Sequence, residues 1–210
     1  MKLYHYYRSS SSYRLRIALN LKQVAYDLES VHLVQDGGQQ HQPAYKALNP
    51  QGLVPTLVVD ADLVLTQSMA ILDFLEQRYP APALLPTDTR ARARALQIAH
   101  LIACDIQPLN NLSVLQYLQR DLAIDDAAKS AWYCHWIQQG FVALETLLAD
   151  SAGQCCVGDT VTWADICLIP QVYNAKRFAI DCQAYPIISR IDAYCQTLDA
   201  FIAAHPDRFV

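Results

Sequence analysis

The spacing of apolar residues along the chain changes character near residue 80. In the first part, short apolar runs, several with a two-residue period, predict strands at 3–6, 26–33, 54–59 and 63–65. Apolar residues three and four positions apart predict helices at 13–22 and 68–79, with a weaker helical turn near Tyr45. This order of strands and helices indicates an α/β domain with a mixed sheet covered by helices.

Three prolines in the segment 80–86 cannot continue a helix, because proline lacks a backbone N–H and fixes φ. Beyond them the spacing is helical throughout, at 90–118, 125–149, 162–178 and 187–204. Thr162 and Asp165 have the spacing of a capping box at the start of the third helix. We therefore expect an α/β domain over 1–80, a linker over 81–89 and an all-α domain over 90–210.

Composition and charge narrow the range of partners. The chain is 53% hydrophobic and 17% charged, which is typical of a compact globular protein and excludes a disordered one. A net charge of -4 without clustered lysine or arginine argues against nucleic-acid binding and favours a small-molecule ligand. We find no signal-peptide pattern and no apolar run of membrane-spanning length, so we expect a cytoplasmic protein without a membrane partner.

The seven cysteines have no paired short spacing with histidines, which argues against a metal site. An odd number of cysteines without a secretion signal points to a reducing compartment, where buried thiols behave as small apolar side chains. We therefore assign no cysteine to catalysis.

Four consecutive serines, Ser9, Ser10, Ser11 and Ser12, lie between the first predicted strand and the first predicted helix. The amino end of a helix stabilises an anion there. A thioredoxin-like fold would have its redox cysteines in this place, but this chain offers only hydroxyls, so a thiol would have to come from the ligand. Taken alone, the four serines are better explained by helix capping, so anion binding needs support from other motifs.

Two further motifs point to a peptide-like ligand with a carboxylate. A proline at the start of a strand, as in Val54-Pro55, can adopt the cis form and leave the preceding backbone free to pair with a ligand. Gln67-Ser68 begins the next helix and can hold a carboxylate, although an edge-strand proline and a simple cap are the alternatives. A thiolate site, a peptide-pairing edge and a carboxylate site together match the parts of glutathione.

With these motifs the chain resembles the zeta class of glutathione transferases, and the resemblance extends over nearly its whole length. The most specific segments are 8–19, 49–50, 54–57, 67–68, 106–115, 157–159, 164–165 and 170–178. It implies the glutathione transferase fold, an α/β thioredoxin-like domain followed by an all-α domain, in a homodimer.

The resemblance also implies where glutathione binds. Ser9, Ser10 and Ser11 would surround the sulfur, with Ser12 and Pro55 beside the site, Val54 would pair with the cysteinyl backbone, and Gln67 and Ser68 would hold the glutamyl end. Gln40 would contact the glycyl end. Gln107, Asn111 and Ser113 correspond to positions of the second domain near the bound thiol. The chain departs from the family at Ser11, where cysteine is common.

The activity implied is a glutathione-dependent cis-trans isomerisation of maleylacetoacetate, in which a thiolate adds reversibly to the conjugated double bond. Arg8 and Arg177 are the candidates for binding the carboxylates of the diacid substrate, because guanidinium offers paired donors. A surface or interdomain ion pair is the alternative for both, and for Arg177 it explains the residue about as well. Maleylpyruvate isomerisation, transfer of glutathione to α-haloacids and glutathione binding without turnover remain alternatives, since fold does not fix function.

Overall fold

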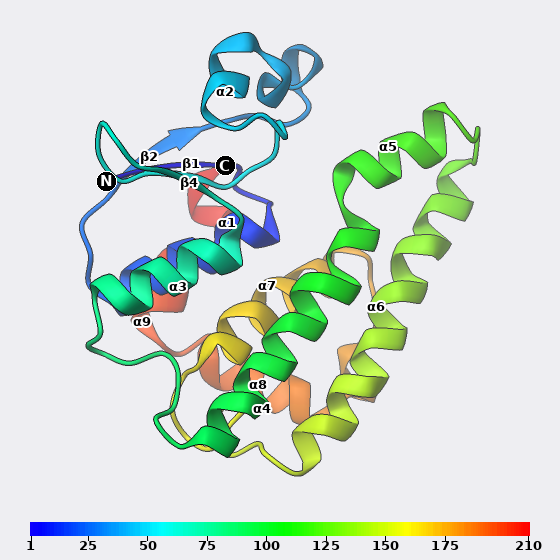
Figure 1. Cartoon of the computed structure of the whole chain (residues 1–210). Coiled ribbons are helices and arrows are strands. Elements are labelled where there is room, and N and C mark those ends of the chain that lie inside the picture. The colour runs from blue at the N-terminus through cyan, green and yellow to red at the C-terminus, as the bar shows by residue number, and fades with distance from the viewer. The chain divides into compact units, whose positions relative to one another are not determined.

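The computed structural model describes residues 1–210 and divides into two compact units (Figure 1). Unit 1 contains Met1–Ala83 together with Leu198–Val210, and unit 2 contains Leu84–Thr197. The division after residue 83 falls inside the expected linker 81–89. The end of the chain differs from the expectation of one domain over 90–210, because its final segment folds with unit 1.

Unit 1 is built on a mixed four-stranded sheet in the order β2-β1-β3-β4. The strands are β1 (Lys2–His5), β2 (Asp27–Ser30), β3 (Thr56–Val58) and β4 (Val64–Thr66). β1 pairs in parallel with β2 and antiparallel with β3, so that Leu3 lies between Leu28 and Leu57. β3 and β4 pair antiparallel as a hairpin. This arrangement confirms the mixed sheet.

Three helices cover the two faces of this sheet: α1 (Ser10–Leu21), α2 (Pro43–Leu48) and α3 (Ser68–Arg78). Figure 1 shows α1 and α3 on one face and α2 on the other. Leu15 and Leu19 of α1 are fully buried, as are Ile71 and Leu75 of α3. Because residues four apart lie on the same side of a helix, each helix turns one apolar face inward. The unit 1 core therefore lies between the sheet and helices α1 and α3.

The final segment of the chain is tied to α1 by hydrogen bonds to its backbone. α9 (Asp199–Ala204) packs against α1, where Arg16 Nε donates to the Ala204 carbonyl at 3.0 Å and Asn20 Nδ2 donates to the Ala200 carbonyl at 3.1 Å. The bond from Arg16 satisfies a carbonyl at the end of α9, which has no partner within that helix. The expectation of one helix over 187–204 was wrong, because one helix ends at Cys195 and α9 begins only at Asp199.

Unit 2 is all helical. Its helices are α4 (Thr89–His100), α5 (Leu112–Arg120), α6 (Asp126–Ala149), α7 (Trp163–Arg177) and α8 (Pro186–Cys195). The capping box at the start of α7 is confirmed, because Thr162 Oγ1 accepts from Ala164 N at 3.2 Å and Asp165 Oδ2 accepts from Thr162 N at 2.8 Å. None of the helices is both long enough and apolar enough to cross a bilayer.

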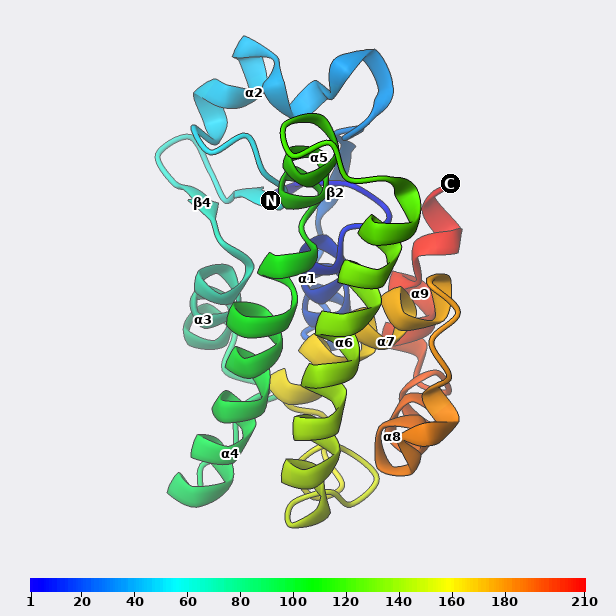
Figure 2. The ribbon, with the colours of Figure 1, turned by 90° about the vertical axis from the view of Figure 1, so that its right-hand side faces the viewer.

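The long helix expected over 90–118 is interrupted in the structure. α4 ends at His100, the π-helical segment Leu101–Ile106 follows, and a 3₁₀ turn begins at Pro108 before α5. Proline removes one helical hydrogen bond and its ring crowds the preceding turn, which explains the break. α6 runs beside the π-helical segment (Figure 2).

The chain that enters unit 2 is anchored rather than free. Leu84 and Leu85 are almost completely buried, and the Leu84 carbonyl accepts from Trp163 N at 3.1 Å at the start of α7. The expected linker 81–89 is therefore partly built into unit 2.

Candidate functional site

Ser9 caps the amino end of α1 and keeps its own hydroxyl proton available. Its Oγ accepts from Ser12 N at 3.2 Å, while its N–H donates to the Tyr6 carbonyl at 3.0 Å. No protein group accepts the Ser9 hydroxyl proton. Because an oxygen that accepts from the helix can still donate its O–H, Ser9 can serve an anionic ligand atom while it caps the helix.

The next two residues present backbone N–H groups without protein acceptors. These are the amides of Ser10 and Ser11, the first two residues of α1. Amides at the start of a helix point along its axis and, with the helix dipole, favour negative charge. Ser12 differs, because its side chain is fully buried and its Oγ accepts from Tyr6 N at 3.4 Å. Ser12 therefore supports the turn from beneath, beside the three serines at the start of the helix.

The loop before β3 offers an unpaired peptide edge. The Val54–Pro55 bond is cis, and neither the N–H nor the carbonyl of Val54 has a protein partner. The preceding carbonyl, that of Leu53, accepts from the Tyr45 hydroxyl at 2.6 Å and from Asn49 Nδ2 at 2.7 Å, so the loop is held in place. An extended peptide can pair with such an edge through main-chain hydrogen bonds.

Gln67 and Ser68 form a strained start to α3. Gln67 has a φ of 68°, in the left-handed region, and its Nε2 donates to Gln51 Oε1 at 2.8 Å. A non-glycine residue held there costs about 1–3 kcal/mol and is typical of ligand-binding positions. Ser68 is nearly buried, and its Oγ accepts from Arg14 Nη1 at 3.2 Å. The carboxylate site expected here thus has a buried cation behind it.

Arg14 is a candidate functional residue that the sequence analysis did not single out. Its side chain is 1% exposed although it lies in α1, one turn before Ala18 on the apolar face of that helix. The only sign of this role in the sequence is that a charged residue occupies a position on the apolar face of the helix. That sign is weak, because many arginines at such positions extend their guanidinium groups to solvent.

Gln40 is buried, and most of its amide is used within unit 1. Its Nε2 donates to the Leu33 carbonyl at 3.2 Å and lies 3.1 Å from His41 Nε2, while Oε1 has no partner. Gly38 precedes Gln40 by two residues, and its φ of 96° favours glycine. A Cβ at this position would also lie 2.6 Å from Gln40 Nε2 and displace the Gln40 side chain. Of the Gln40 side chain, only the amide oxygen Oε1 remains available to accept a hydrogen bond from a ligand.

The charges around the start of α1 are positive. Arg8 is exposed, lies 4.8 Å from the centroid of the Tyr7 ring and has no carboxylate partner. Burial, together with Arg16, lowers the pKa of His5 to about 4, so that its ring is neutral at physiological pH. Burial raises the pKa of Tyr6, whose hydroxyl therefore also stays neutral. The environment favours an anion.

The three site residues expected in unit 2 lie close together in the chain around the start of α5. Asn111 caps this helix, and its Oδ1 accepts from Ser113 N at 3.0 Å and from Ser113 Oγ at 2.8 Å. Gln107 is half-buried, and its side-chain amide has no protein partner. Gln107 therefore keeps hydrogen-bonding capacity, whereas Asn111 and Ser113 mainly satisfy one another.

Arg177 ends α7 as an exposed cation without a carboxylate partner in unit 2. Its Nη1 donates weakly to Asn174 Oδ1 at 3.4 Å, and its guanidinium lies 5.9 Å from the Phe178 ring. Its neighbour Lys176, in contrast, pairs with Asp192 at 2.5 Å. The ion-pair interpretation of Arg177 thus has no support within its own unit.

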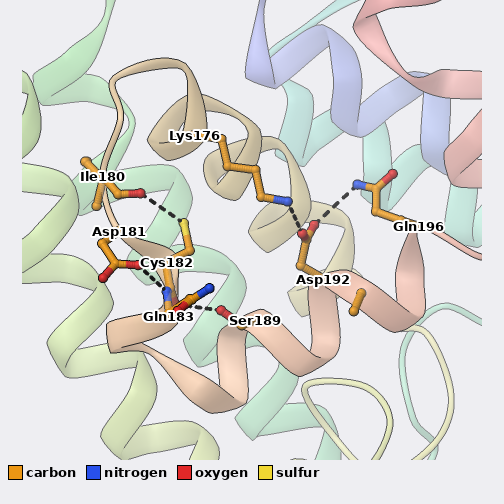
Figure 3. A pocket seen from close by; sticks show the side chains of 9 residues that line it. Lys176, Ile180, Asp181, Cys182, Gln183, Ser189, Asp192 and Gln196 are labelled. Atoms are coloured by element: carbon orange, nitrogen blue, oxygen red, sulfur yellow. Dashed lines mark hydrogen bonds and ion pairs between the residues drawn. The ribbon is translucent and has the colours of Figure 1, made fainter.

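A depression of about 410 Å³ is present on unit 2, but none of the expected site residues lines it (Figure 3). Its polar groups bind one another: Lys176 and Gln196 both donate to Asp192, and Ser189 Oγ donates to the Cys182 carbonyl at 2.5 Å. Because these groups already have partners, the depression offers little to a ligand. The candidate site therefore rests on the residues described above.

Comparison with known proteins shows similarity to one family, the glutathione transferases. Residues 3–83 match the model of the glutathione S-transferase N-terminal domain. A probable maleylacetoacetate isomerase of Vibrio cholerae is 47% identical, over 98% of this chain and 95% of the relative. A maleylpyruvate isomerase of a Ralstonia species is 50% identical, over 98% of this chain and 97% of the relative.

The solved structure of a maleylpyruvate isomerase, described as a bacterial glutathione S-transferase of the zeta class, is 49% identical at a TM-score of 0.94 and covers 98% of this chain and 97% of its own. Other solved structures hold the expected cofactor or a conjugate of it. A maleylacetoacetate isomerase of Methylobacterium extorquens AM1, with bound malonate and glutathione, is 41% identical at a TM-score of 0.95 and covers 100% of this chain and 98% of its own. A maleylacetoacetate isomerase of Anaeromyxobacter dehalogenans, also 41% identical, has a TM-score of 0.86 over 99% of this chain and 94% of its own. Its active site holds dicarboxyethyl glutathione and citrate.

Proposed function

The chain belongs to the zeta class of the glutathione transferases, and from this premise we propose that it converts maleylacetoacetate to fumarylacetoacetate with glutathione. The observation that carries the proposal is the start of α1, where the Ser9 hydroxyl and the amides of Ser10 and Ser11 are unpaired donors in a position without a cysteine. Such donors stabilise a thiolate that the ligand brings.

Glutathione would bind along the remaining unpaired groups of unit 1. The backbone of Val54, next to Pro55, would pair with the cysteinyl residue, and Gln67 and Ser68 would hold the glutamyl carboxylate at the start of α3. Gln40 would contact the glycyl end through its unpaired side-chain oxygen, which can accept a hydrogen bond from the glycyl N–H. Gln107, Asn111 and Ser113 are proposed as contacts from unit 2, and of these Gln107 has the free side-chain amide.

The reaction proposed is addition, rotation and elimination. The glutathione thiolate forms a C–S bond to one carbon of the cis double bond, the π electrons move onto the conjugated ketone, and an enolate results. Rotation about the remaining single bond follows, and collapse of the enolate restores the double bond as trans and expels the thiolate. The dicarboxyethyl glutathione in the Anaeromyxobacter relative supports this chemistry, because it is a thioether formed at one carbon of a diacid skeleton.

Arg8 and Arg177 are proposed to bind the substrate carboxylates. Both are exposed guanidinium groups without an ion-pair partner in their own units, and guanidinium suits a carboxylate because it offers parallel donors and stays charged. The malonate and the citrate in the two solved relatives indicate that sites of this class accept diacids and larger polycarboxylates.

Maleylpyruvate is the second candidate substrate. The Ralstonia maleylpyruvate isomerase is 50% identical over nearly the whole chain, slightly more than the Vibrio relative. The same addition and elimination would act on this shorter diacid. Transfer of glutathione to α-haloacids uses the same thiolate in an irreversible displacement and has less support among the relatives.

A homodimer and a cytoplasmic location complete the proposal. The first is carried over from the resemblance to the zeta class. The second follows from the chemistry, because the reaction needs glutathione in its thiol form and reducing compartments maintain that form.

Parallel assays of maleylacetoacetate and maleylpyruvate with the purified protein test the choice of substrate. Loss of the conjugated enol absorbance measures the rate with each substrate. The proposal predicts a higher kcat/KM for maleylacetoacetate than for maleylpyruvate. A higher value for maleylpyruvate would assign the protein to that reaction instead. Turnover of an α-haloacid alone would contradict isomerase function altogether.

A further inference from the structure

Arg14 carries a positive charge that no protein anion balances. Its side chain is 1% exposed, and only one of its three guanidinium nitrogens has a partner, the Nη1 that donates to Ser68 Oγ at 3.2 Å. Nε and Nη2 are buried without any hydrogen bond. None of the ion pairs of the chain includes Arg14.

Such an arrangement is costly in a protein that binds nothing there. Guanidinium keeps its charge under physiological conditions, and a buried charge without a counter-ion is strongly unfavourable. Arg16, two residues further along α1, is also buried, but hydrogen bonds satisfy its guanidinium. Its nitrogens donate to the carbonyls of Ala204 and Tyr7, and one lies 3.2 Å from His5 Nδ1. The two buried arginines of α1 therefore differ in how their charge is accommodated.

The bond between Arg14 and Ser68 fixes the direction of the Ser68 proton. Because Nη1 has only hydrogens to offer, Ser68 Oγ must accept in this bond. The Ser68 O–H must then donate elsewhere. Ser68 is the first residue of α3, where the helix dipole favours negative charge, so an anion at this helix start would receive the Ser68 proton.

We propose that Arg14 is a positioning residue for the glutamyl α-carboxylate of glutathione. By donating to Ser68 Oγ, Arg14 leaves the Ser68 hydroxyl proton free to bond the carboxylate, and its positive charge lies next to Ser68 on the protein side. The carboxylate in turn supplies the negative charge that Arg14 lacks within the protein. This inference rests on the proposed glutathione site and adds a residue that acts on it through Ser68.

The test compares two ligands in the full-length protein by calorimetry: glutathione, and 4-aminobutanoyl-cysteinyl-glycine, which lacks only the α-carboxylate. Arg14→Met removes the charge at similar volume, and we expect it to weaken glutathione binding about 10- to 100-fold, the value of a charge-assisted hydrogen bond. Binding of the analogue should stay unchanged. The ligand-free variant should unfold at the same or a higher temperature, because an unbalanced buried charge has been removed.

Arg16→Met is the matched control, since it removes a buried arginine of the same helix whose charge is already accommodated. It should lower the unfolding temperature and change the affinity for both ligands equally. Arg14→Lys keeps the charge with a single donor group and should lose less glutathione affinity than Arg14→Met; it also provides the test if the methionine variant does not fold.

Equal losses for glutathione and the analogue in the Arg14 variants would overturn the role of Arg14. A native protein that binds neither ligand would contradict the glutathione site itself, and with it the proposed function. The two failures are therefore distinguishable.

Discussion

The hydroxyl of Ser9 has two tasks that substitutions can separate: it accepts from Ser12 N as a helix cap, and it has a free proton to donate. Ser9→Ala should lower kcat/KM about 100-fold, as loss of a donor to a developing or bound anion does. It should also raise the pKa of the bound glutathione thiol, measured from the ultraviolet absorbance of the thiolate. The lost cap should cost about 1 kcal/mol of unfolding free energy.

Ser9→Thr is the control, because threonine keeps an oxygen that caps and donates. It should retain most of the activity and a thiol pKa close to that of the native protein. A Ser9→Ala variant with the native thiol pKa would show that the amides of Ser10 and Ser11 suffice, and would remove Ser9 from catalysis.

Arg177 and Lys176 are adjacent cations in different situations, which makes them a matched pair. Lys176 is paired with Asp192, whereas Arg177 has no carboxylate partner in unit 2. Arg177→Ala should raise KM for the diacid about 10-fold or more while kcat falls less, because a charge-assisted contact to substrate is lost. Lys176→Ala should leave KM unchanged. An unchanged KM in Arg177→Ala would exclude this residue from the substrate site.

At the scale of elements, His5 of β1 contacts Arg16 of α1, and the His5 ring stays neutral at physiological pH. Arg16 Nη1 lies 3.2 Å from His5 Nδ1, and burial and Arg16 lower the His5 pKa from 6.5 to about 4. The unfolded chain therefore binds this proton more readily than the folded one. The stability contributed by neutral His5 is fully present above pH 6.5 and is lost as the pH falls toward 4, by about 3 kcal/mol.

His5→Gln should flatten this part of the stability profile, because glutamine offers an acceptor to Arg16 but does not titrate. Urea unfolding between pH 7 and pH 4 measures the difference, and His100→Gln, at an exposed helix end, is the control. Native and His5→Gln proteins with parallel profiles would show that His5 does not control acid stability.

The elements also show how far apolar spacing predicts a fold. Helix α1 and the capped start of α7 were predicted because local signals, a serine cap and the Thr162–Asp165 pair, agree with the packing. The interruption between α4 and α5 was missed, although Pro108 marks it, because the apolar spacing continues through it. The division of 187–204 into α8 and α9 has no proline to mark it and follows from packing against α1.

The same limit applies to the candidate site. Ser9, Val54 and Gln67 were singled out because they lie at predicted strand and helix ends, which the local pattern identifies directly. The burial of Ser12 was not anticipated, and Arg14 was not singled out. Their roles depend on burial, and sequence spacing does not distinguish a buried polar side chain on an amphipathic helix from one that reaches water.

At the scale of the whole molecule, the final segment Leu198–Val210 belongs to unit 1 although it follows unit 2 in the chain. A truncation after Thr197 would remove the carbonyl partners of Arg16 and Asn20. It would also remove the buried side chains of Phe201 and Ala204 and so expose the face of α1 against which α9 packs. It should therefore destabilise unit 1 by several kcal/mol, since it exposes core surface and leaves a buried charge poorly bonded. Thermal unfolding and limited proteolysis would measure this.

Removal of Val210 alone is the control for that truncation, because its side chain is 90% exposed. This deletion should leave stability unchanged. A truncated protein that unfolds like the native one would show that α9 is an appendage rather than a part of the core of unit 1.

The central claim is that glutathione supplies the nucleophile and is regenerated in every turnover. The most direct measurement is the rate of maleylacetoacetate isomerisation with glutathione, with S-methylglutathione and with no thiol, together with the amount of free glutathione recovered. The account predicts many turnovers per glutathione, full recovery of the thiol, and no catalysis with the methylated form. Isomerisation that proceeds without a free thiol, or that consumes glutathione in proportion to product, would contradict it.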